Sequence, residues 1–251
     1  MFRTAAFFPH MERISILCLL LLATPLKAAD PVTTAIQHAE ALPPDKALAA
    51  LLPYEQQGAR RADYVARLAI AWAEVTDQQG KEAAQKAVRY AETAAQLNPR
   101  EAQAHLALAI AYGKMTGFVD NTTKMKLSRQ IRDEATRALE LDPGLDLAHQ
   151  ILGRWHYGIA TLNPILKLAA KVVYGELPQA SMDEAVAHLE KAAALNPKRL
   201  SNHHQLAMVY QAIGKPEKAG PHWKAILSLP SSGDPDDNAA VAAARKALGK
   251  R

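Results

Sequence analysis

One six-residue phrase occurs three times in the chain and constrains the fold more than any other feature. The copies occupy residues 94–99 (AAQLNP), 138–143 (ALELDP) and 192–197 (AAALNP). In each copy Asn or Asp precedes a proline, and proline disfavours the helical conformation in the residue before it. Each phrase therefore predicts the end of a helix in a repeating unit. We expect the same proline to open the next helix, where its missing N–H is not needed.

A second pattern lies upstream of each phrase. A leucine and a small residue are followed by a ring-bearing side chain in four segments: Leu68-Ala69 with Trp72, Leu108-Ala109 with Tyr112, Leu152-Gly153 with His156, and Leu206-Ala207 with Tyr210. This pattern is typical of the first helix of a tetratricopeptide hairpin, in which a small residue lets the two helices cross closely. The sequence therefore predicts an all-α fold, a tetratricopeptide-type solenoid of helical hairpins.

The repeats are longer than the standard unit. The phrase prolines Pro99, Pro143 and Pro197 are 44 and 54 residues apart, against about 34 residues in the standard repeat. The smaller excess falls around residues 117–129, and the larger, mostly apolar one covers residues 158–181 in the third full repeat. There, Asn163 is placed as an N-cap, Pro164 as the first helical residue and Gly175 as a stop, which predicts a short inserted helix.

Four segments follow from these patterns. We expect a signal peptide at residues 1–28, a degenerate helical pair that caps the stack at 29–62, repeats at 63–232 and a capping helix at 233–251. A solenoid needs such terminal elements because its end repeats would otherwise expose an apolar face.

The first segment has the order of a secretory signal. Arg3 and Arg13 precede an apolar run at residues 14–26, and Lys27-Ala28-Ala29 follows it. The run is shorter than the roughly 20 residues that span a bilayer, so we expect cleavage near Ala28 and Ala29 and an exported, periplasmic or secreted chain. The start codon is Met1 or Met11.

Composition and motifs exclude several function classes. The net charge is +5, and removal of the leader takes away three basic residues and one acidic residue, which leaves +3. So small a positive surplus does not indicate a nucleic-acid-binding protein. The single cysteine, Cys18, lies in the leader. No nucleophile elbow, phosphate loop or zinc-protease motif occurs. The adjacent His203 and His204 point different ways on a helix. We therefore expect no enzyme, no cofactor and no metal site.

The chain resembles the regulator of microtubule dynamics family, a branch of tetratricopeptide proteins, over roughly residues 60–248. The resemblance depends on Leu152-Gly153-Arg154-Trp155, the inserted segment 165–178 and the closing residues 227–230. It implies a non-enzymatic adaptor fold with this insertion in the same repeat, and we expect an exported, bacterial member. The microtubule role is not carried over, because an exported chain would not meet cytosolic tubulin.

The binding surface is predicted from solenoid geometry, because first helices line the concave side of such a stack. Their side chains that point away from the hairpin partner are the candidate groove residues: Gln103, Leu106, Ile110, Lys114, Leu147, Gln150, Arg154, Tyr157, Ser201, His204, Met208 and Gln211. This mixed lining suits a protein or peptide partner, which is our first hypothesis.

The inserted helix leaves two interpretations open. Lys167 and Lys171 form one polar stripe among apolar residues, which predicts a mostly buried helix that stabilises the solenoid. Alternatively, the helix walls a pocket for a lipid, an acyl chain or another apolar molecule, or touches a membrane surface. The candidate residues of the insertion are Ile165, Leu166, Leu168, Val172 and Val173.

Overall fold

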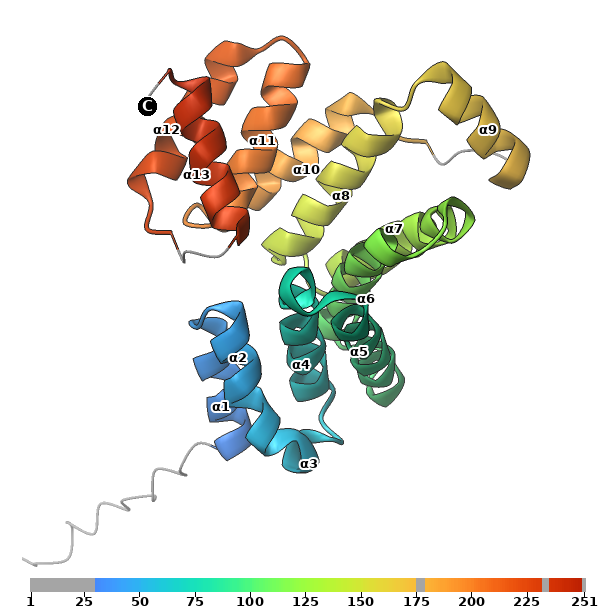
Figure 1. Ribbon diagram of the computed structural model, residues 1–251, viewed down its shortest axis with the longest axis vertical. Helices are drawn as coiled ribbons and strands as arrows, with labels where there is room; N and C mark the ends of the chain where they lie inside the picture. Colours follow the sequence, from blue (N-terminus) through green and yellow to red (C-terminus); the bar gives the residue numbers. More distant parts are fainter. Residues whose placement is uncertain (1–29, 175–178, 232–234, 250–251) are drawn as a thin grey trace, which may run out of the picture. The chain divides into compact units, whose positions relative to one another are not determined.

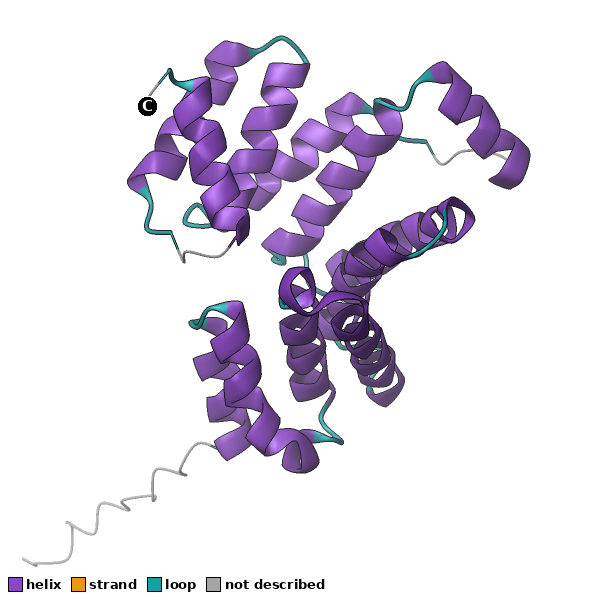
Figure 2. Cartoon of the chain, in the orientation of Figure 1, coloured by secondary structure: helices purple, strands orange, loops and turns teal. Residues whose placement is uncertain are grey.

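The computed structural model describes residues 30–174, 179–231 and 235–249, and every regular element in these ranges is a helix (Figure 2). The N-terminal helices are α1 (Pro31–Glu40), α2 (Pro44–Leu51) and α3 (Glu55–Gly58), with a 3-10 turn, η1 (Leu52–Tyr54), before α3. The remaining elements are α4 (Ala62–Glu74), α5 (Thr76–Leu97), α6 (Ala102–Met115), η2 (Thr116–Phe118), α7 (Asn121–Leu141), α8 (Asp146–Ala160), α9 (Pro164–Tyr174), α10 (Met182–Leu195), α11 (Leu200–Ala212), α12 (Pro216–Ser228) and α13 (Pro235–Ala247).

The helices pair as four antiparallel hairpins, α4 with α5, α6 with α7, α8 with α10, and α11 with α12 (Figure 1). Helices α1 and α2 pack on α4 of the first hairpin, and α13 packs on α11 and α12 of the fourth. The solenoid fold and its apolar helical insertion, α9, are confirmed. The expected signal peptide lies outside the described residues. No helix in the described ranges has the length and apolarity needed to cross a membrane.

The three repeated phrases end helices as expected. Helices α5, α7 and α10 stop directly before Asn98, Asp142 and Asn196. The backbones of these residues are not helical, with φ of −148°, −143° and −133°, and those of Asn98 and Asp142 are extended. The expectation for the prolines was wrong, because α6, α8 and α11 each begin three residues after the proline. The prolines lie in the turns, where their carbonyl oxygens accept hydrogen bonds from the histidines described below.

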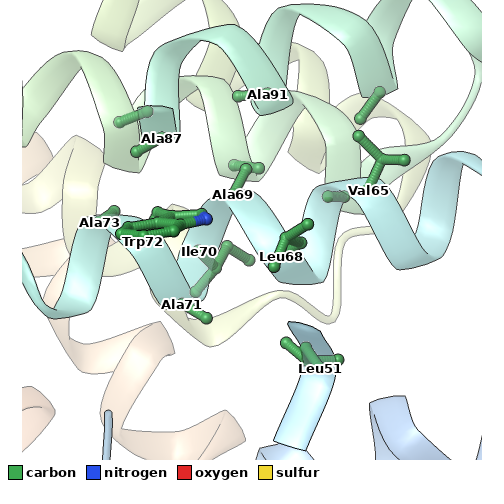
Figure 3. Close-up of a cluster of buried hydrophobic side chains, with 14 of the residues drawn as sticks. Leu51, Val65, Leu68, Ala69, Ile70, Ala71, Trp72, Ala73, Ala87 and Ala91 are labelled. Atoms are coloured by element: carbon green, nitrogen blue, oxygen red, sulfur yellow. The ribbon is translucent and has the colours of Figure 1, made fainter. Parts of the chain in front are cut away.

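Small residues line the crossing of each hairpin. Ala69 of α4 points toward α5, from which Ala87 and Ala91 point back, and all three are fully buried (Figure 3). Leu51 of α2 approaches the opposite side of α4 (Figure 3). Methyl side chains let the helix axes approach, because a larger residue would hold them apart.

The third hairpin has glycine at the crossing, where the others have alanine. A Cβ atom added to Gly153 would lie 2.5 Å from Cγ of Leu189 and 3.1 Å from the backbone oxygen of Ala185. Gly153 therefore sets the short distance between α8 and α10.

A buried polar network joins the third hairpin to the fourth. Asn202 of α11 is fully buried and donates from Nδ2 to Asp146 of α8 at 2.9 Å and to the carbonyl of Ala192 at 3.0 Å. Gln150 of α8 donates to Oδ1 of Asn202 and to Oγ of Ser201, each at 2.8 Å. Because buried amides are costly when unpaired, these bonds fix how α11 follows α8.

The variant Gly153→Ala tests the close crossing. We expect it to lower the free energy of unfolding, because overpacking costs about 1–3 kcal/mol and alanine regains only about 1 kcal/mol of helix propensity. The matched control is Gly158→Ala on the same helix, where an added Cβ meets no atom within 4 Å. The control should raise the melting temperature measured by circular dichroism. A shift of both variants in the same direction would contradict this account.

Candidate functional site

The predicted groove residues lie on α6, α8 and α11, the first helices of three consecutive hairpins. The exposed members of the set are Gln103, Arg154, Met208 and Gln211. The half-buried members are Ile110, Lys114, Leu147, Tyr157, Ser201 and His204.

The two remaining candidates, Leu106 and Gln150, are buried inside the solenoid. Leu106 packs against Ala138 and Ala148, and Gln150 belongs to the network with Ser201 and Asn202. Their expected place in an open groove is corrected accordingly, because both side chains hold neighbouring helices together. Lys114 is also engaged, since its Nζ pairs with Asp77 at 2.9 Å.

Five of the exposed or half-buried candidates lie on α8 and α11, which contact each other. Arg154 and Tyr157 are one turn apart on α8, and His204, Met208 and Gln211 follow one stripe of α11. Burial lowers the pKa of His204, and the nearby charge of Arg154 lowers it further. In the described chain no hydrogen bond or ion pair engages the Arg154 side chain. We name these five residues the α8–α11 face.

A histidine series, which the sequence analysis missed, ties each turn to its hairpin. His105, His149 and His203 each lie six residues after a phrase proline, and Nε2 contacts that proline's carbonyl oxygen at 3.0, 3.3 and 2.9 Å. Nδ1 contacts the second helix of the same hairpin, at Glu134 (2.6 Å), Nδ1 of His188 (3.0 Å) and Nδ1 of His222 (2.9 Å), respectively. The six-residue interval was the available signal, visible once the three phrases are aligned.

The third hairpin carries a larger polar cluster than the others. One ring nitrogen each of His156 and His188 and one carboxylate oxygen of Glu184 lie within 4.8 Å of one another. In the described residues this is the only group of at least three His, Cys, Asp or Glu side chains so arranged. Burial lowers the pKa of His149, His156 and His188, which favours their neutral form at pH 7.

The inserted helix α9 begins as predicted but differs in its burial. The backbone N–H of Leu166 donates to Oδ1 of Asn163 at 2.8 Å, which confirms the N-cap. Ile165 and Leu168 are 79% and 65% exposed, and Leu166 is 51% exposed. The expected mostly buried helix is therefore wrong for these residues. Lys167 is the half-buried one, and its Nζ donates to the carbonyl of Ala160 at 3.1 Å.

The remaining insertion candidates lie outside what the structure describes. The side chains of Val172 and Val173 and all of Gly175 belong to this group. No other helix in the described ranges packs extensively against α9.

Comparisons with known proteins agree with the fold. A thermophilic tetratricopeptide protein of Thermus thermophilus superposes with a TM-score of 0.62 at 17% identity, over 87% of this chain and 97% of that one. Mouse regulator of microtubule dynamics protein 2 is 25% identical over 186 residues, 72% of this chain and 45% of that protein. Regulator of microtubule dynamics protein 1 of Caenorhabditis elegans is 26% identical over 147 residues, 59% of this chain and 65% of that protein.

The chain thus spans less than half the length of the mouse relative. A family model described as regulator of microtubule dynamics protein 1-3 matches residues 33–250, which include all four hairpins and the insertion. The chain therefore belongs to the regulator of microtubule dynamics family.

Proposed function

We propose that this chain is a non-catalytic scaffold that binds a protein or peptide partner on the first helices of its hairpins, centred on the α8–α11 face. The main observation in support of this proposal is that Arg154 and Met208 are both exposed. They occupy the same repeat position on neighbouring helices, the position that the half-buried Ile110 holds in α6.

The chemistry of this face supports a protein partner. Methionine is flexible and polarisable, so it adapts to varied apolar surfaces, and Met208 is 44% exposed. Arginine and aromatic residues supply much of the energy at protein interfaces, and Arg154 lies one turn from Tyr157. An unpaired guanidinium on α8 and an exposed methionine at the same repeat position of α11 suit a segment that carries both a carboxylate and an apolar residue.

Partner capture with surface variants tests the scaffold. We expect the double variant Arg154→Glu, Met208→Asp to recover at least about tenfold less of the partner that the unaltered protein captures from its own compartment, because loss of even one hot-spot side chain costs about 2 kcal/mol or more and about 1.4 kcal/mol is tenfold in affinity. The matched control is Arg137→Glu, a charge reversal on an exposed part of α7 that pairs with Glu140. Equal recovery by both variants, or capture of no partner, would overturn the proposal.

We further propose that the chain is exported, on the basis of the basic, apolar and small-residue order of residues 1–28. Amino-terminal sequencing of the protein purified from its native cells should begin at or next to Ala29. A mature chain that begins at Met1 or Met11 would refute export.

A second function, lipid binding by α9, is favoured by one observation. Three large apolar residues, Ile165, Leu166 and Leu168, face solvent on a helix whose sequence contains two lysines and no acidic residue. An exposed apolar face flanked by positive charge binds the boundary between lipid headgroups and acyl chains, most strongly when the lipid is anionic.

Vesicle flotation tests lipid binding. The unaltered protein should float with phosphatidylglycerol vesicles, and the double variant Ile165→Glu, Leu168→Glu should remain in the soluble fraction, because it places two charges on the apolar face. Leu97→Glu provides the control, since it alters an exposed leucine of α5 away from the insertion. Failure of the unaltered protein to float would exclude this function without affecting the scaffold proposal.

A further inference from the structure

The third hairpin departs from the others at its ring position. In the second and fourth hairpins this position is tyrosine, and the hydroxyl donates to a glutamate on the preceding repeat: Tyr112 to Glu92 at 3.3 Å, and Tyr210 to Glu190. The third hairpin has His156 at the ring position and Thr136 where the glutamate would be. The ring in this hairpin therefore lacks the usual carboxylate partner.

His156 is oriented instead toward the partner helix of its own hairpin. Its ring stacks with His188 of α10 at a centroid distance of 5.7 Å and an interplanar angle of 17°. Its Nδ1 is buried and has no hydrogen-bond partner in the described chain. Buried polar atoms in proteins are nearly always satisfied, so this nitrogen calls for an interaction that the helices alone do not supply.

The neighbouring hydrogen bonds fix the proton positions of the histidines. The Nε2–H of His149 donates to the carbonyl of Pro143, so its Nδ1 must act as the acceptor in the contact with His188. The proton of that contact then belongs to Nδ1 of His188, which leaves the Nε2 lone pair of His188 free. A histidine that donates one ring N–H to a fixed acceptor and presents the other nitrogen is the usual form of a metal ligand.

We propose that His156, Glu184 and His188 bind a divalent transition-metal ion, with Zn²⁺ as the matching ion, and that His149 orients His188 for it. Two imidazoles and a carboxylate form a ligand set that Zn²⁺ accepts in tetrahedral geometry, with water as the fourth ligand. Ligand atoms on one zinc ion lie about 3.4 Å apart, so the 4.8 Å cluster must contract slightly. Glu184 is exposed, so a rotamer change brings its carboxylate closer, and small ring rotations of the half-buried His156 and His188 adjust the distance between their nitrogens.

The site is accessible and lies where an ion has a mechanical effect. A surface hollow of about 390 Å³ is lined by His156, Glu184 and residues 179–181, which gives an ion and its water a path from solvent. His156 lies near the end of α8 and Glu184 near the start of α10, directly before and after the insertion. A bound ion would therefore clamp the base of the insertion.

Metal titration of the full chain without a polyhistidine tag tests the site. Zn²⁺ should bind with one equivalent in competition with a chromophoric chelator, and Co²⁺ should give the visible absorption of tetrahedral coordination. Glu184→Gln and His156→Ala should each weaken Zn²⁺ binding at least about tenfold, and His149→Gln about 10–100-fold, because outer partners of ligating histidines contribute that much. Zn²⁺ should also raise the melting temperature of the unaltered chain.

The matched control is His222→Ala, which changes the equivalent histidine pair of the fourth hairpin. That variant should keep the affinity for Zn²⁺, because the pair of His203 and His222 is not part of a three-ligand group. Circular dichroism in chelator-treated buffer establishes that each variant is folded, and Glu184→Gln, at an exposed position, keeps the test valid if another variant unfolds. Absence of Zn²⁺ binding, unaltered affinity in Glu184→Gln, or an equal loss in His222→Ala would overturn the proposal.

Discussion

The close crossing of two helices within each hairpin is the constraint on which the rest of this structure depends. Alanine at the crossing of α4 and α5, and glycine at the crossing of α8 and α10, let the backbones approach until side chains on either side of the contact meet. His149 and His188 are 39 residues apart in sequence, yet their ring nitrogens are 3.0 Å apart because Gly153 permits that approach. The polar contacts between the two helices of a hairpin therefore depend on the small size of the residue at their crossing.

The repeated geometry places one histidine at the same point in three hairpins, and the second helix decides its chemistry. His105 lies beside Glu134 and forms an ion pair with it when protonated. His149 and His203 each lie beside another imidazole instead, and each of these pairs shares one proton between two rings. The ring position adds a second variable, since tyrosine bonds to a glutamate of the preceding repeat whereas His156 has no such partner. A single scaffold thus supports a structural contact in some repeats and a ligand set in one.

Features that local chemistry controls were predictable from the sequence, and features that depend on distant partners were not. Asn98 and Asp142 end helices because of the proline that follows each of them, and the Asn163 cap needs only its own helix. The burial of α9 was mispredicted, because the apolar pattern of a helix does not show whether another element packs against its apolar face. Leu106 and Gln150 were assigned to the groove by position alone, and the contacts that bury them come from other helices: α7 and α8 for Leu106, and α11 for Gln150. The cluster of His156, Glu184 and His188 was missed because its members are brought together only by the crossing of α8 and α10.

The insertion and the third hairpin are best understood together. Helix α9, which does not pack extensively against another helix of the described chain, keeps one orientation only if the two chain segments at its base are held, because a flexible segment has many accessible conformations. The crossing at Gly153, in the middle of α8, holds α8 against α10, and the hydrogen bond from Lys167 to Ala160 holds the start of α9. Between them, His156 lies one turn before the end of α8, and Glu184 lies in the first turn of α10. An interaction that joins these two turns would act on the orientation of the exposed apolar residues, and so on whatever they contact, without touching the α8–α11 face.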